Sequence, residues 1–166
     1  MRLRSPLLIL LGAALVAAAL LQEGLRDVSP ESQKTLELKL SNFTLASLRV
    51  GEEAKKELVA LHGGAELQLE DALIAEYIAE DGRLVKVWVG VAQNESVARE
   101  LLARMHTGLG SSRIFSPDGS VEVGEIQVFR ARGMGEVHYY YARGNRVVWV
   151  SGLLSEQELA SLVENF

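Results

Sequence analysis

Apart from Met1 and His62, the soft and borderline metal donors of this chain fall in two short stretches. Met105 is followed directly by His106, and Met134 precedes His138 by four residues. Thioether sulfur combined with imidazole nitrogen is a donor set that suits Cu(I). These four residues are therefore the candidate copper ligands. Because Met105 also lies on the apolar stripe of a predicted helix and His138 lies in a predicted strand, structural roles are favoured and no cofactor is expected.

Other residue combinations that could support catalysis lack the context that the chemistry requires. The chain has no cysteine, which excludes thiol catalysis and thiolate metal sites. Ser151, Ser155 and His138 suggest a hydrolase, but no G-x-S-x-G sequence surrounds either serine. Gly133-Met134-Gly135 connects two predicted strands and opens no helix, so it lacks the amide cradle of a phosphate loop. We therefore expect a non-enzymatic protein.

Aromatic side chains are concentrated in the predicted sheet. Three consecutive tyrosines occupy residues 139–141. Successive side chains of a strand point to opposite faces, so Tyr140 should share one face with His138, and Tyr139 and Tyr141 should share the other. This pattern fits either a core with cross-strand pairs or an interaction face. The residues predicted to form the interaction face are His138, Tyr140, Trp149 and Trp88.

The first residues of the chain indicate where such a face would work. Two arginines precede a charge-free apolar run from Pro6 to Leu21, a pattern that sends the following chain across a membrane. This pattern predicts that residues 1–24 are a signal-anchor, with the N-terminus inside and the domain outside the cell membrane. The run is, however, shorter than the about 20 residues that span a bilayer. The alternative is a signal peptide cleaved near Ala19, which would leave a secreted domain.

The rest of the chain divides into a linker, residues 25–34, and one extracytoplasmic α+β domain, residues 35–166. The whole chain has 17 Lys and Arg against 22 Asp and Glu. Without the two N-terminal arginines the balance is 15 against 22, which leaves a net charge of -7. An acidic domain of this kind disfavours nucleic acid as a partner.

Hydrophobic periodicity and turn residues predict the elements that hold the aromatic residues. Asn94 is a good helix N-cap, and Ser155 with Glu158 forms a capping box. Asp81-Gly82 is a strong signal for a β-hairpin turn. Helices are expected at 52–62, 94–107 and from 155 onward, and strands at 72–80, 83–92, 121–131, 136–142 and 146–151. Residues 35–40 alternate between apolar and polar, which fits a strand or the end of an extended linker.

This order of elements favours an α+β fold with an antiparallel sheet. We expect about five strands, arranged as a hairpin plus a meander, with about three helices packed on one face of the sheet. One N-terminal hydrophobic helix should precede this domain. The second face of the sheet is then left to face solvent, line a groove or meet a partner.

The C-terminal stretch, residues 146–166, carries a strand with Trp149, then Gly152 and a capped Ser-x-x-Glu-Leu helix. It resembles the ending of small membrane-tethered extracytoplasmic domains of unknown function near the LolA/RseB-like lipoprotein-sorting proteins, and more distantly that of the PsbP-like fold. The resemblance implies a membrane-tethered α+β domain with an accessory role. The lipobox cysteine found in many such proteins is absent.

Together these features predict a membrane-tethered extracytoplasmic accessory or interaction domain. Its expected partners are the membrane, through Pro6 to Leu21, and a protein of a membrane-associated complex. One alternative is a carrier of an apolar ligand or lipid, in which Tyr140, His138 and Trp149 would line a dry pocket of at least about 300 Å³. The other is a copper-handling protein, which requires Met134 and His138 to converge with Met105 or His106.

Overall fold

The computed structural model describes residues 39, 40 and 42–166 of the 166-residue chain. The predicted hydrophobic helix, the linker at 25–34 and the first residues of the possible strand at 35–40 lie outside the described residues. Within the described residues, no helix has both the length and the apolar character needed to cross a bilayer.

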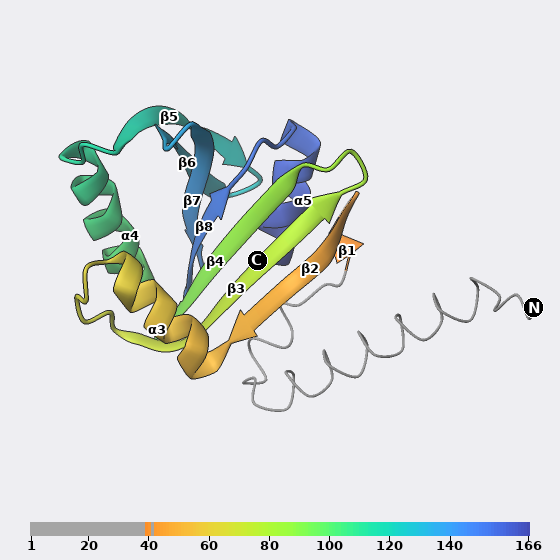
Figure 1. Cartoon of the computed structure of the whole chain (residues 1–166). Helices are drawn as coiled ribbons and strands as arrows, with labels where there is room; N and C mark the ends of the chain where they lie inside the picture. The colour runs from red at the N-terminus through yellow and green to blue at the C-terminus, as the bar shows by residue number, and fades with distance from the viewer. Residues whose placement is uncertain (1–38, 41) are drawn as a thin grey trace, which may run out of the picture.

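The described residues form one antiparallel sheet with three helices (Figure 1). The strands are β1 (Lys39–Leu40), β2 (Phe43–Val50), β3 (Leu69–Ala79), β4 (Leu84–Ala92), β5 (Phe115–Val123), β6 (Ile126–Gly133), β7 (Glu136–Arg143) and β8 (Arg146–Ser151). The helices are α3 (Gly51–Leu61), α4 (Glu95–Gly110) and α5 (Glu156–Asn165). The strand order is β1-β2-β3-β4-β8-β7-β6-β5, so two meanders meet at the β4–β8 pair. Helix α4 carries the chain from the central strand β4 to the edge strand β5.

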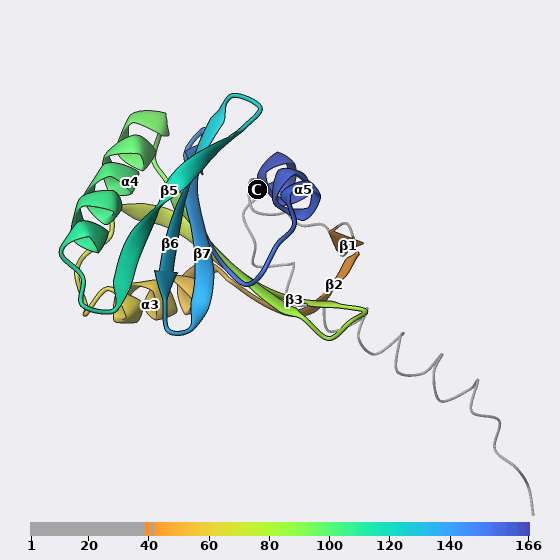
Figure 2. The same cartoon turned by 90° about the horizontal axis from the view of Figure 1, so that it is seen from above.

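The predicted fold class is wrong in the number of strands and in the placement of the helices. The sheet has eight strands in place of about five, although β1 has only two residues. The helices do not share one face. Figure 2 shows α5 on the side around which the sheet curves, with α3 and α4 on the other side. The predicted β3–β4 hairpin and the predicted order of the β6–β7–β8 meander are present.

Local irregularities explain why the sequence pattern missed β2 and most of β5. The strand predicted at 121–131 is in fact the end of β5 and most of β6, separated by the turn at Gly124 and Glu125. A β-bulge between Leu45 and Ser47 shifts the register of β2, so its apolar residues do not alternate cleanly along the sequence. In β5, the turn-like residues 116–119 belong to a strand whose register shifts between Pro117 and Ser120. Asp118 at this shift accepts hydrogen bonds from Arg130 and Arg132, which attach the irregular strand to β6.

The larger hydrophobic core lies between the curved sheet and α5. Its buried residues come from β2, β3, β4, β6, β7, β8 and α5, and Val123 of β5 packs against them. Phe166 at the end of the chain packs edge-on against Tyr77 at 6.3 Å between ring centroids. Tyr139 and Tyr141 belong to this core, whereas Tyr140 packs on the opposite face with α4. The predicted alternation of the three tyrosines is therefore confirmed.

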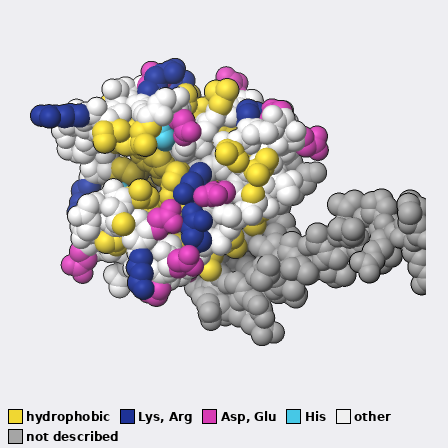
Figure 3. All heavy atoms as spheres, viewed as in Figure 1, with side chains coloured by type: hydrophobic (Ala, Val, Ile, Leu, Met, Phe, Trp, Pro, Cys, Tyr) yellow, Lys and Arg dark blue, Asp and Glu magenta, His cyan; other side chains and the backbone are white. Residues whose placement is uncertain are grey.

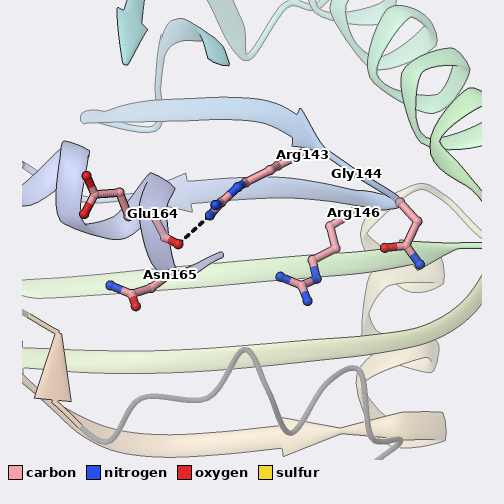
Figure 4. Close-up of a pocket in the computed structure, with 6 residues that line it drawn as sticks. Arg143, Gly144, Arg146, Glu164 and Asn165 are labelled. Atoms are coloured by element: carbon pink, nitrogen blue, oxygen red, sulfur yellow. Dashed lines mark hydrogen bonds between the residues drawn. The ribbon is translucent and has the colours of Figure 1, made fainter. Parts of the chain in front are cut away.

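Both ends of α5 are attached to the sheet by charged side chains. At its start, the predicted capping box is present, and Arg83 of the β3–β4 hairpin donates to both carboxylate oxygens of Glu158 at 3.1 and 2.9 Å. At its other end, Arg143 donates to the carbonyl of Val163 at 2.8 Å and to that of Glu164, the second of which Figure 4 shows. Arg146 donates to the carbonyl of Phe166 at 3.3 Å. Cations there complement the partial negative charge at the C-terminal end of a helix.

Candidate interaction face

One row of large side chains crosses the sheet on the face that α3 and α4 cover. It is made by directly opposed residues of five neighbouring strands, and we call it the aromatic row. Its members are Ile74, Trp88, Trp149, Tyr140 and Phe129, from β3, β4, β8, β7 and β6. The Trp149 and Tyr140 rings stack at 5.3 Å, and the Tyr140 and Phe129 rings at 5.4 Å. Cross-strand register thus brings together three of the four residues predicted for the interaction face.

The fourth predicted residue, His138, lies two positions from Tyr140 on the same face of β7. Its ring contacts Trp149 at 5.2 Å and Phe115 at 5.1 Å between centroids. Its Nε2 donates a hydrogen bond to the carbonyl of Gly133 at 3.1 Å, and only 5% of the residue is exposed. The buried Nδ1 has no hydrogen-bond partner among the described residues.

Helix α4 covers part of the aromatic row, so the residues of the row differ in how much of their surface is exposed to solvent. Tyr140 is fully buried under α4, where it packs with Ala131 of β6 and with Leu109 of α4 itself. Trp88 and Trp149 are only partly buried, and they pack against the clusters under α3 and α4 respectively. Figure 3 shows a hollow between the regions of α3 and α4, with hydrophobic side chains at its floor. We use the name tryptophan hollow for the surface formed by the directly opposed Trp88 and Trp149, which pack against the clusters under α3 and α4 respectively.

A charged quartet borders the tryptophan hollow on the side of β2 and α3. Arg49 and Lys86 each contact both Glu57 and Glu76, at 2.9 to 3.3 Å. Lys86 Nζ also lies 4.8 Å from the centroid of the Trp88 ring, a cation–π distance. Desolvation opposes ionisation of Glu76, but hydrogen bonds from Lys86, Arg49 and Ser47 outweigh it and lower the pKa of Glu76. The quartet has two cationic and two acidic side chains, so its formal charges balance.

A second groove lies on the other side of α4, with a volume of about 620 Å³. One side of α4, the β5–β6 turn, β6 and the end of β7 line it. Phe129 of the aromatic row reaches this groove, as does His106, whose Nδ1 lies 2.8 Å from the Tyr140 hydroxyl. Its rim is charged through Glu95, Arg99 and Arg143. The groove is therefore amphipathic and open, in contrast to the dry pocket expected for an apolar-ligand carrier.

The hydrogen bond between Tyr140 and His106 connects α4 to the aromatic row and gives a direct test of this arrangement. Replacing Tyr140 with phenylalanine should lower the free energy of unfolding by about 1 kcal/mol, because it removes the hydroxyl that is hydrogen-bonded to His106 Nδ1. The measurement is urea unfolding monitored by tryptophan fluorescence. Tyr141→Phe is the matched control, because the buried Tyr141 hydroxyl has no partner among the described residues. Equal losses in both variants would contradict the assigned hydrogen bond.

The candidate copper ligands occupy separate structural positions. Met134 projects from the β6–β7 turn with 78% of its surface exposed, whereas Met105 packs in the cluster with Tyr140 and Trp149. His106 and His138 each use one ring nitrogen in the hydrogen bonds described above. No group of three or more His, Cys, Asp or Glu side chains in the described part of the chain is arranged to hold a metal ion.

The sequence pattern did not reveal several residues that shape this face. Phe115, which packs edge-on against Trp149 at 5.5 Å, lies in the strand that was missed. The charged quartet comes from β2, α3, β3 and β4, and β2 was missed as well. Alternating apolar positions signal one strand at a time, so they carry no information on which strands become neighbours.

No protein-family model matches the chain, and no curated protein or solved structure is significantly similar to it.

Proposed function

We propose that the chain is a membrane-tethered extracytoplasmic accessory domain that binds a protein partner through the tryptophan hollow. The charge-free run from Pro6 to Leu21 behind two arginines supports the tether. The domain has a binding role and no catalytic one. Its partner belongs to the same membrane-associated complex.

The observation that carries this proposal is the position of Trp88 and Trp149. They are directly opposed on β4 and β8, and each remains partly exposed between α3 and α4. Residues that served only the core would be more completely buried, as Tyr140 is in the same row. Tryptophan is enriched among the residues that dominate binding energy at protein interfaces, because it offers a large rigid surface.

The charges around the hollow fit the same interpretation. Protein interfaces combine an apolar or aromatic centre with a polar rim. Here the indoles supply the centre and the charged quartet supplies a rim whose charges are already paired. The expected partner segment therefore presents an apolar or aromatic side chain, flanked by neutral polar groups, and needs no strong charge of either sign.

The side chains that could suggest catalysis are engaged in structural hydrogen bonds. Ser151 donates to Glu136, and the Ser155 hydroxyl caps α5. His138 donates from Nε2 to a backbone carbonyl. Within the described residues, these contacts favour a binding role over a hydrolase.

The groove between α4 and β6 favours a second candidate function, the binding of a small amphipathic ligand. Its volume of about 620 Å³ lies in the range of small-molecule sites. Leu102, Ile126 and Phe129 would contact the apolar part of such a ligand, and the charged rim its polar part. Tyr140, His138 and Trp149, which were predicted to line the pocket of a carrier, are not among its lining residues.

Site-specific photocrosslinking in native membranes tests the proposed partner binding. A photoreactive phenylalanine analogue at residue 88 should give an adduct with one protein, and the same analogue at Val121 should give none. Val121 is the matched control because it is exposed on β5, away from the hollow. Adding Trp149→Leu should reduce the adduct at residue 88 by about tenfold or more, since loss of a hot-spot tryptophan costs about 2 kcal/mol.

Two outcomes would refute this function. One is equal adducts at residues 88 and 121, which would show nonspecific contact. The other is the absence of any adduct at residue 88 in a protein whose circular dichroism and unfolding midpoint match those of the wild type.

A further inference from the structure

Most exposed large apolar side chains of the described domain gather at one end of the sheet. Seven such side chains are exposed in the described residues, and two of them, Leu61 and Val121, lie elsewhere. The other five are Ile78, Leu84, Ile114, Met134 and Leu153, and we call them the apolar end. Exposed apolar side chains are ordinary when scattered, but their concentration at one end indicates a contact surface.

Strand register places these five residues along one line across the sheet. Ile78 pairs with Leu84 at the β3–β4 hairpin (Figure 1). Gly152, the neighbour of Leu153, packs so closely on β4 that a Cβ there would lie 2.7 Å from the Leu84 carbonyl oxygen. The Gly152 N–H donates to the carbonyl of Val137 at 3.1 Å. The line continues through two further register pairs, Glu136 with Gly133 and Gly133 with Phe115, which border Met134 and Ile114.

Folding alone does not account for these residues. Leu84 and Leu153 are 65% and 66% exposed, so they contribute little to the core. Met134 has a φ of 54°, a backbone conformation that glycine or asparagine adopts at less cost, and yet its long apolar side chain points to solvent. An apolar contact outside the described domain would explain why these positions are not polar.

The chemistry of the apolar end differs from that of the tryptophan hollow. Its members are aliphatic or thioether side chains, with no tryptophan, tyrosine or phenylalanine among them. Protein interfaces are enriched in aromatic residues and arginine, and leucine is under-represented among their hot spots. Leucine, isoleucine and methionine side chains partition well into the acyl boundary of a bilayer. These properties favour lipid over protein as the occupant.

The point at which the chain enters the domain supports the same occupant. Lys39 pairs with Thr44, and Thr44 pairs with Ile78, so β1 lies two strands from the apolar end. Seventeen residues, 22–38, separate Leu21 from Lys39, and even fully extended they reach at most about 60 Å. A chain held in the membrane at Pro6 to Leu21 would therefore keep the domain within about 60 Å of the bilayer, with the tether joining the sheet on the side of the apolar end.

We infer that the apolar end rests on the lipid surface and orients the domain on its membrane, an inference that depends on the tether in the proposed function. The β3–β4 turn, with Asp81 paired to Arg83 at 2.7 Å, would lie among the lipid headgroups. The domain is acidic, so contact should not require anionic lipid. This arrangement leaves the tryptophan hollow, on the face covered by α3 and α4, open to a protein partner.

Environment-sensitive probes on the full chain test this inference. The protein has no cysteine, so single substitutions give one labelled site each. Leu84→Cys and Leu153→Cys place a nitrobenzoxadiazole probe at the apolar end. Leu61→Cys is the matched control, because this leucine is 61% exposed and ends α3. Each labelled protein is reconstituted into phosphatidylcholine vesicles, and probe emission and quenching by nitroxide-labelled lipid are measured.

Probes at residues 84 and 153 should emit at shorter wavelength than the probe at residue 61 and should be quenched at least threefold more by nitroxide lipid. Equal signals at all three sites, in protein that floats with the vesicles, would overturn the lipid contact and leave the proposed tether intact. Protein that does not float with the vesicles would overturn both. Shielding at residues 84 and 153 that appears only in native membranes would assign the apolar end to a protein partner and refute the lipid contact.

Discussion

Replacing Gly152 with alanine should lower the free energy of unfolding by about 3 kcal/mol, because backbone strain and a steric clash add together. Gly152 has a φ of 136°, which side-chain-bearing residues rarely adopt. A Cβ at this position would lie 2.7 Å from the carbonyl oxygen of Leu84 and 3.1 Å from a methyl group of Val85. The carbonyl belongs to the backbone of the central strand β4 and has little freedom to move.

Gly124→Ala separates the two causes. Gly124 also has a positive φ, of 58°, but no heavy atom lies within 4 Å of the position that a Cβ would take. It should therefore lose only about 1 kcal/mol, the cost of the left-handed conformation. Urea unfolding of both variants measures the difference. Similar losses in the two variants would show that the close approach of Gly152 to β4 is not important for stability.

Acidification should destabilise the domain through Glu158. Its hydrogen bonds with Arg83, opposed by burial and assisted by the capping box, lower the pKa of Glu158 from 4.5 to about 2. Because the pKa of Glu158 is lower in the folded state than in the unfolded state, the ionised Glu158 contributes its full stabilisation above pH 4.5. This stabilisation is lost as the pH falls from 4.5 to 2, with a size of about 2 kcal/mol. Glu76, whose pKa is also lowered, adds to the loss in the same direction.

Glu158→Gln tests this pH dependence. The variant should be less stable than the wild type at pH 7 by about 2 kcal/mol, because it lacks the ion pair with Arg83, whereas the glutamine amide oxygen can still accept from the Ser155 N–H. The difference should shrink steadily below pH 4.5. Glu164→Gln, a change at an exposed carboxylate of the same helix, is the matched control. A constant difference between Glu158→Gln and wild type from pH 7 to pH 2.5 would rule out Glu158 as the titrating group.

Both predictions concern the same corner of the structure. Arg83 donates to Glu158 and also, at 3.0 Å, to the carbonyl of Leu153. The close approach of Gly152 to the Leu84 carbonyl adds a second contact between the same two segments. The β3–β4 hairpin and the segment before α5 are therefore joined, and this places Leu84 and Leu153 near each other at the apolar end. A rigid support of this kind is what a surface that orients a domain requires.

Features controlled by residues close together in the sequence could be predicted. The Asp81-Gly82 hairpin, the Asn94 cap and the Ser155–Glu158 capping box are all present, because turns and caps depend on a few consecutive residues. The alternation of residues 139–141 followed from strand geometry alone. The same alternation placed His138 and Tyr140 on one face.

Features that depend on distant residues were decided by the tertiary structure. The bulges hid β2 and β5, and the placement of α5 opposite α3 and α4 depends on which sheet face offers the larger apolar surface. Trp88 and Trp149 meet because β4 pairs with β8, and the apolar end exists because four separate segments finish along one line. Strand pairing combines backbone hydrogen bonds with burial over the whole sheet, so no short stretch of sequence determines it.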